Sequence, residues 1–122
     1  MHVLLIDDEV QVVHNLAIYL RSIYHHTVSY LTEATDEQML HAHLDDVQPD
    51  AVILDYGMVP AGDVIYQWIK KWNPHVKIAF YTSYAHDAEF HRAMRTIGAS
   101  DDEIISKREV GNDISKILKV LS

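Results

Sequence analysis

Short apolar runs along the chain are separated by stretches in which apolar residues recur with a longer period. His2–Ile6 and Ala51–Leu54 are continuous apolar runs, and each is followed directly by aspartate. Runs of this length predict strands that are buried on both faces of a sheet. Apolar, β-branched and aromatic residues predict three further strands, over residues 27–32, 76–81 and 103–106.

After each of these runs, apolar residues recur every three or four positions, which predicts an amphipathic helix. Thr35 and Gln38 fit a capping box at the start of the second helix, and Gly98 is placed to end the fourth. Pro49 and Pro74 limit the second and third helices. The predicted core-facing positions are Val10, Val13, Ala17, Leu20 and Tyr24; Leu40, Leu44 and Val47; Ile65, Trp68, Ile69 and Trp72; Phe90, Ala93, Met94 and Ile97; and Ile114, Ile117, Leu118 and Leu121.

Five strands, each followed by a helix, predict an α/β fold with a parallel sheet and right-handed crossovers. The chain has 122 residues, and its 48% hydrophobic and 23% charged content is that of a globular domain. It contains no low-complexity tract and few linker signals, so we expect a single domain over residues 1–122.

The charge and the missing residue types exclude several classes of function. The formal net charge of −8 opposes direct binding to nucleic acid phosphates. The chain has no cysteine, which excludes disulfides and thiolate metal sites. No apolar run approaches membrane-spanning length and no signal peptide precedes the first strand, so we expect a cytoplasmic protein without membrane contact.

Polar side chains that suit phosphoryl transfer lie where the predicted strands end. Asp7 and Asp8 follow the first strand, Asp55 the third, Thr82 the fourth and Lys107 the fifth. In an open parallel sheet, ligands bind beyond these carboxyl ends. Carboxylates attract Mg²⁺ and can attack phosphorus, while lysine and hydroxyl groups stabilise charge on phosphoryl oxygens. Each residue alone also fits a helix cap or a surface charge, but their joint position at four strand ends favours function.

Four segments resemble, in order and across nearly the whole chain, the receiver domain of bacterial two-component response regulators: VLLIDDE, AVILDYGMVPAG, IAFYTS and IGASDDEIISK. The resemblance implies a flavodoxin-like (βα)5 three-layer sandwich with a five-stranded parallel sheet in the order 2-1-3-4-5. It also implies a signalling switch that catalyses only its own phosphorylation and dephosphorylation.

The resemblance further implies a role for each site residue. Asp55 would accept a phosphoryl group from a phosphohistidine on a sensor histidine kinase or a phosphotransfer protein. Asp7, Asp8 and Asp55, together with the backbone carbonyl of Gly57, would hold Mg²⁺. Thr82 and Lys107 would contact the phosphoryl group. These two and the acceptor Asp55 are the expected catalytic residues.

Phosphorylation would then change the conformation or the partner binding of the domain. The resemblance implies homodimerisation through the fourth helix, the fifth strand and the fifth helix. The output domain or target protein is not identifiable from the sequence, which fits a stand-alone receiver as well as one domain of a longer protein.

Three of the features that distinguish this chain within the family pattern bear on the mechanism. Arg108 follows Lys107 where the family usually has proline, so we expect this loop to be trans and displaced, or strained. Ile104 stands at the usual aromatic switch position, which weakens the threonine–aromatic relay and suggests output through another surface. Gly57 would leave open surroundings that admit water to the acceptor and shorten the lifetime of the phosphoryl group.

Three alternatives stay open. An aspartyl phosphatase or phosphotransferase would place a second acid two positions after the nucleophile, where this chain has Gly57. A degenerate receiver would bind its partner without phosphorylation; the altered loops favour it, and the intact site residues oppose it. A histidine metal site would use pairs such as His41 with His43, but their side chains diverge along a helix, which fits solvated histidines better.

Overall fold

Five parallel strands form one sheet in the order β2-β1-β3-β4-β5. The computed structural model describes residues 1–22, 25–34, 36–107, 116–117 and 119–120. The sheet confirms the predicted flavodoxin-like α/β fold and its strand order. The strands are β1 (His2–Ile6), β2 (Thr27–Leu31), β3 (Ala51–Leu54), β4 (Lys77–Thr82) and β5 (Ile104–Ser106).

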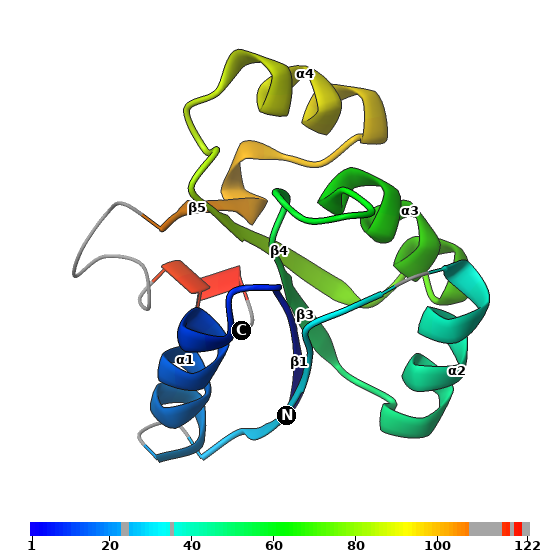
Figure 1. Cartoon of the computed structure of the whole chain (residues 1–122), viewed down its shortest axis with the longest axis vertical. Coiled ribbons are helices and arrows are strands. Elements are labelled where there is room, and N and C mark those ends of the chain that lie inside the picture. The colour runs from blue at the N-terminus through cyan, green and yellow to red at the C-terminus, as the bar shows by residue number, and fades with distance from the viewer. Residues whose placement is uncertain (23–24, 35, 108–115, 118, 121–122) are drawn as a thin grey trace.

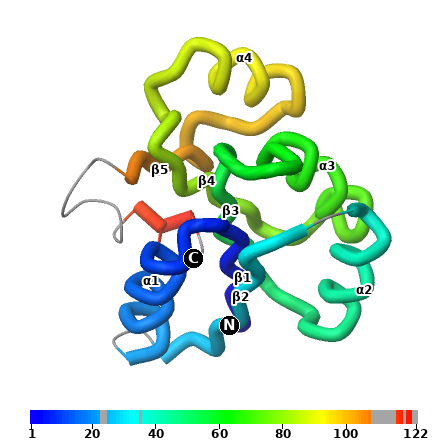
Figure 2. Tube along the Cα trace, in the orientation of Figure 1, coloured from blue at the N-terminus to red at the C-terminus, as the bar shows by residue number. Residues whose placement is uncertain are grey.

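Helices cover both faces of the sheet, so the molecule has three layers (Figures 1 and 2). Leu40, Ile65 and Phe90 come from three different helices and pack into one core on the same face. Leu16 and Ile117 pack into a second core on the opposite face. The helices are α1 (Val10–Ser22), α2 (Glu37–Val47), α3 (Gly62–Trp72) and α4 (Ala88–Ile97).

The first predicted helical stripe is correct except at its beginning. Val13, Ala17 and Leu20 are buried, together with Leu16. Val10 was expected in the core but is 67% exposed, because the core under α1 begins one turn later, at Val13. Of the remaining predicted stripe positions, Tyr24, Ile114, Leu118 and Leu121 lie outside the described residues.

The helix ends are set by local hydrogen bonds. Asp36 is the N-cap of α2, and its carboxylate accepts the Met39 N–H at 2.7 Å, so the helix begins at Glu37. Thr35 itself lies outside the described residues. Gly98 ends α4 as predicted: its φ of 79° is left-handed, and its N–H bonds to the last carbonyls of the helix.

A short 3₁₀ helix, η1 (Asp101–Glu103), occupies the acidic stretch before β5. The Ser100 N–H donates to the Glu103 carboxylate at 3.0 Å and so closes a capping box. Glu103 was expected in the strand, but β5 begins at Ile104 because the 3₁₀ turn takes up the preceding residues. In the part of the chain that the structure describes, no helix has both the length and the apolar character needed to cross a membrane.

Gly62 begins α3 and allows that helix to approach the end of β3. A Cβ atom at this position would lie 2.3 Å from the Asp55 carbonyl oxygen and 2.7 Å from the Tyr56 Cα. The Gly62 N–H donates to the Tyr56 carbonyl at 2.9 Å and closes the intervening loop. The loop that carries Asp55 is therefore packed against backbone at a distance that only glycine permits.

We expect Gly62→Ala to lower the free energy of unfolding by about 1–3 kcal/mol, because backbone atoms must move to admit the methyl group. Urea denaturation of both proteins measures the difference. Helix propensity alone would favour alanine by about 1 kcal/mol. A variant that is more stable than the wild type would therefore show that the close contact does not constrain the loop.

Candidate functional site

Backbone hydrogen bonds continue past the strand ends and fix the first residues beyond them. The Asp55 N–H donates to the Ile6 carbonyl at 2.9 Å, which ties the end of β3 to the end of β1. The Lys107 N–H donates to the Thr82 carbonyl at 3.0 Å, which ties the residue after β5 to β4. The parallel register thus fixes the backbone positions from which the candidate side chains extend.

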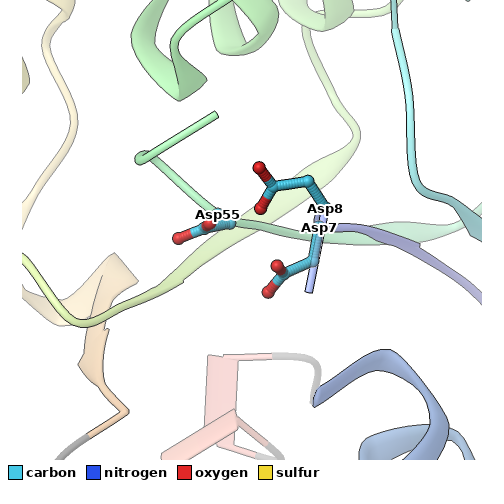
Figure 3. Close-up of side chains that lie close together, drawn as sticks. All are labelled: Asp7, Asp8 and Asp55. Carbon is cyan, nitrogen blue, oxygen red and sulfur yellow. The ribbon is translucent and has the colours of Figure 1, made fainter. Parts of the chain in front are cut away.

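The carboxylates of Asp7, Asp8 and Asp55 meet at this edge of the sheet (Figure 3). One oxygen from each lies within 4.8 Å of the other two. Asp55 is 3% exposed and Asp7 is 5% exposed, whereas Asp8 is exposed to solvent. The three oxygens are hard donors of the kind that Mg²⁺ binds, and two of them are withdrawn from water.

Lys107 brings a positive charge to this cluster. Its Nζ lies 2.8 Å from Asp7 Oδ2 and 3.5 Å from Asp55 Oδ1. It also lies 3.2 Å from Glu9 Oε1, a partner that the sequence analysis did not identify. Glu9 directly follows the acidic pair, and this position is the only signal in the sequence that could have indicated it.

Burial and charge shift the proton affinities of the buried pair. Burial raises the pKa of the Asp7 carboxyl above its ordinary value of 3.8, and the negative charge of Asp55 adds to this despite hydrogen bonds from Lys107 and the Glu9 amide. Burial opposes charging of Lys107, but its hydrogen bond to Asp7 and the charge of Asp55 raise its pKa overall. The two shifts therefore have different main causes: burial raises the pKa of Asp7, whereas the neighbouring carboxylates raise the pKa of Lys107 against the effect of burial.

Thr82 lies at the end of β4 and is fully buried. Its Oγ1 accepts the N–H of Tyr84 at 3.1 Å. The predicted hydroxyl is therefore present at the edge of the sheet, and it anchors the loop that follows β4.

Gly57 is exposed to solvent, but the Tyr84 ring lies beside it, and the expected access of water to the acceptor stays a prediction. A Cβ atom at Gly57 would lie 2.4 Å from Cε2 of Tyr84, so the tyrosine ring fills the place where a side chain would stand. Tyr84 is 45% exposed and covers this part of the loop. The proposed role of the Gly57 carbonyl as a metal ligand stays a prediction.

Two further expectations concern the region around Lys107. Ile104 is half-buried and packs against the larger core, as an aliphatic side chain would. Arg108 lies outside the described residues, so the expected displacement or strain of its loop stays a prediction. The Lys107 side chain itself does reach the acidic cluster.

The histidines form no metal-binding group among the residues that the structure describes. His41 Nε2 lies 2.8 Å from the Trp68 carbonyl, and His2 Nε2 lies 2.7 Å from Ser29 Oγ. These two rings are therefore held by protein partners.

The family model for the response regulator receiver domain matches residues 3–119. Because the match spans nearly the whole sequence, this chain belongs to the response regulator receiver family. No curated protein matches the chain in a direct sequence comparison.

Solved structures of receiver domains share the fold. One is the signal receiver domain of the DNA-binding response regulator merR from Colwellia psychrerythraea 34H, with a TM-score of 0.77, 21% identity, and coverage of 99% of this chain and 97% of that chain. Another is the chemotaxis protein CheY4 of Vibrio cholerae, with a TM-score of 0.76, 18% identity, and coverage of 99% and 98%. A third is RcsB from Salmonella enterica serovar Typhimurium, with a TM-score of 0.78, 22% identity, and coverage of 100% and 68%.

We expect the stability contributed by Asp7 to decline as pH rises. Because its pKa is raised on folding, the folded protein holds the proton more tightly than the unfolded chain does. The contribution is therefore most favourable at acid pH and falls as pH rises from 3.8 through the folded pKa. Urea denaturation over this range, in buffer with a chelator, compares the wild type with Asp7→Asn.

The difference in unfolding free energy, wild type minus Asp7→Asn, should decrease with increasing pH. The same series on Asp46→Asn, an exposed position of α2, gives the reference slope for removing a surface carboxylate. A difference that grows with pH would contradict a raised pKa at Asp7.

Proposed function

We propose that this receiver domain is a phosphoacceptor that takes a phosphoryl group onto Asp55. The observation that carries the proposal is the environment of the Asp55 carboxylate. It is buried at the end of β3, with Lys107 Nζ at 3.5 Å from one oxygen and two further carboxylates beside it. Receiver domains are signalling modules and generally not enzymes, so the transfer serves to change the state of the chain.

The chemistry is a displacement at phosphorus. An Asp55 carboxylate oxygen attacks the phosphorus of a phosphohistidine on a sensor kinase or phosphotransfer protein. The new O–P bond forms an acyl phosphate while the N–P bond of the donor breaks, and its electron pair returns to the imidazole nitrogen. The charge on the phosphoryl oxygens requires positive or hydrogen-bonding groups nearby.

Two side chains supply such groups from within this chain. Lys107 neutralises charge on the phosphoryl oxygens, and moves only a short way because it already lies between Asp7 and Asp55. The Thr82 hydroxyl donates a hydrogen bond to a phosphoryl oxygen. The tether of the Lys107 backbone to Thr82 keeps both groups at the same edge of the sheet.

The acidic cluster also fits Mg²⁺. Lys107 Nζ lies near the carboxylates of Asp7, Glu9 and Asp55, and Asp8 adds a fourth carboxylate beside two of them. Among the described residues, the site therefore has an excess of negative charge and oxygen donors. Asp7, Asp8 and Asp55 would hold the ion, with the Gly57 carbonyl as a further ligand. When bound, Mg²⁺ would neutralise charge that develops on the transferred group. Without the ion, Lys107 offsets part of the negative charge of the carboxylates.

The acceptor can be tested by labelling with a small phosphodonor, such as acetyl phosphate, in the presence of Mg²⁺. The wild type should gain one phosphoryl group by mass spectrometry, and Asp55→Asn should gain none because the attacking carboxylate is removed. Asp46→Asn should label like the wild type. A wild type that takes up no phosphoryl group would instead favour a receiver that binds partners without phosphorylation.

Metal binding can be tested through stability. Mg²⁺ at ten times its Kd should raise the free energy of unfolding by about 1.4 kcal/mol, since only the folded chain assembles the site. Asp8→Asn should lose most of this gain, and Asp46→Asn should retain it. Urea denaturation with and without Mg²⁺ measures the effect. An Asp8→Asn protein that gains as much as the wild type would place the ion elsewhere.

A further inference from the structure

Ile104 leaves this receiver without a polar or aromatic side chain at the β5 position three residues before Lys107. An aliphatic side chain has no group that donates or accepts a hydrogen bond. The hydroxyl of Thr82 therefore cannot exchange a hydrogen bond with this residue when the site changes state. A signal from Asp55 needs another route to the surface.

We propose that Tyr84 detects the phosphoryl group on Asp55 and transmits the change through Tyr56 and Phe90 to α4. This inference rests on the proposed function of Asp55 as the acceptor. Two sets of contacts carry it, one through the backbone of Tyr84 and one through its ring.

The backbone of Tyr84 joins Thr82 to the start of α4. Its N–H donates to Thr82 Oγ1 at 3.1 Å, and its carbonyl accepts the N–H of Asp87 at 2.9 Å. Asp87 is the N-cap of α4, and its carboxylate accepts the N–H groups of Glu89 and Phe90. Two successive hydrogen bonds through the backbone of Tyr84 therefore connect the Thr82 hydroxyl to the N-cap of α4.

The ring of Tyr84 is held by two neighbours on the loop that carries the acceptor. It occupies the space above Gly57, where a Cβ atom would come within 2.4 Å. It also meets the ring of Tyr56 edge to face, with centroids 5.9 Å apart and planes at 72°. Because 45% of Tyr84 is exposed, the ring has solvent on its other side into which it can move.

Tyr56 connects this ring to the core side of α4. Its ring meets Phe90 edge to face at 5.0 Å, and its backbone N–H donates to Asp55 Oδ1 at 2.9 Å. Phe90 is fully buried, and it and Met94 are the buried residues of α4. One of the two side chains that anchor the helix therefore contacts the residue next to the acceptor.

These contacts define a sequence of changes. When the Thr82 hydroxyl turns towards a phosphoryl oxygen, the Tyr84 N–H loses its acceptor. The loop shifts, the Tyr84 ring leaves Gly57, and Tyr56 loses one of its two ring partners. Phe90 then repacks and α4 moves with it.

Amide hydrogen exchange of α4 tests the route. Exchange over residues 88–97 is compared for the free protein and for the protein with Mg²⁺ and beryllofluoride, the phosphomimetic present in the RcsB structure. In the wild type, binding should change the exchange of these amides. In Tyr84→Ala the change should fall by more than about half, because the ring contact is gone.

Three other variants separate the ring contact from general effects. Tyr84→Phe keeps the ring and should respond like the wild type. Tyr56→Leu breaks the second contact and should lose the response like Tyr84→Ala. Tyr19→Ala is the matched control, since Tyr19 is a tyrosine of α1 with the same 45% exposure, and should respond fully. Gly57→Ala, which must displace the ring, should shift the free protein towards the exchange pattern of the bound wild type.

The outcomes distinguish this inference from the proposed function. A wild type that is labelled by acetyl phosphate and binds beryllofluoride but shows no change in α4 overturns the inference alone. A full response in Tyr84→Ala, with binding confirmed by ¹⁹F NMR, also overturns it. A wild type that is neither labelled nor bound overturns the proposed function, and the inference with it.

Discussion

The site depends on an electrostatic imbalance among the described residues at the edge of the sheet. The Lys107 ammonium group lies near three carboxylates, and the carboxylate of Asp8 lies beside two of these. Burial makes this arrangement costly, because Asp7 and Asp55 are withdrawn from water beside each other. Burial raises the pKa of Asp7, and the neighbouring carboxylates raise the pKa of Lys107. A bound cation or a phosphoryl group would change the balance between the carboxylates and the Lys107 ammonium group, so either one would change the interactions within the site.

The register of the parallel strands places the charged side chains at one edge of the sheet, and most of this arrangement could be predicted from the sequence. Continuous apolar runs ending in Asp7 and Asp55 indicate two buried parallel strands, and such strands end at the same edge of a sheet. The backbone bond from Asp55 to Ile6 confirms this alignment. The order of the strands required the family resemblance, because periodicity alone does not say which strands are neighbours.

The sequence could not predict contacts that depend on side-chain direction. Glu9 directly follows Asp8, and Tyr84 lies two residues after Thr82, but their spacing does not say whether they turn towards the site or away from it. The exposure of Val10 has a similar origin, since a helical stripe does not show where the core beneath it ends. Asp36 caps α2, and the sequence alone did not select it because two adjacent residues can both satisfy the capping pattern.

The contact between Gly57 and Tyr84 links two loops that are far apart in the sequence. A side chain at position 57 and an aromatic ring at position 84 compete for the same volume, so neither residue can be exchanged without regard to the other. During divergence of related chains, a larger residue at one position would therefore be accepted only after the other had changed. The two loops around the acceptor are therefore expected to change together, because the missing side chain of Gly57 leaves the space that the Tyr84 ring occupies.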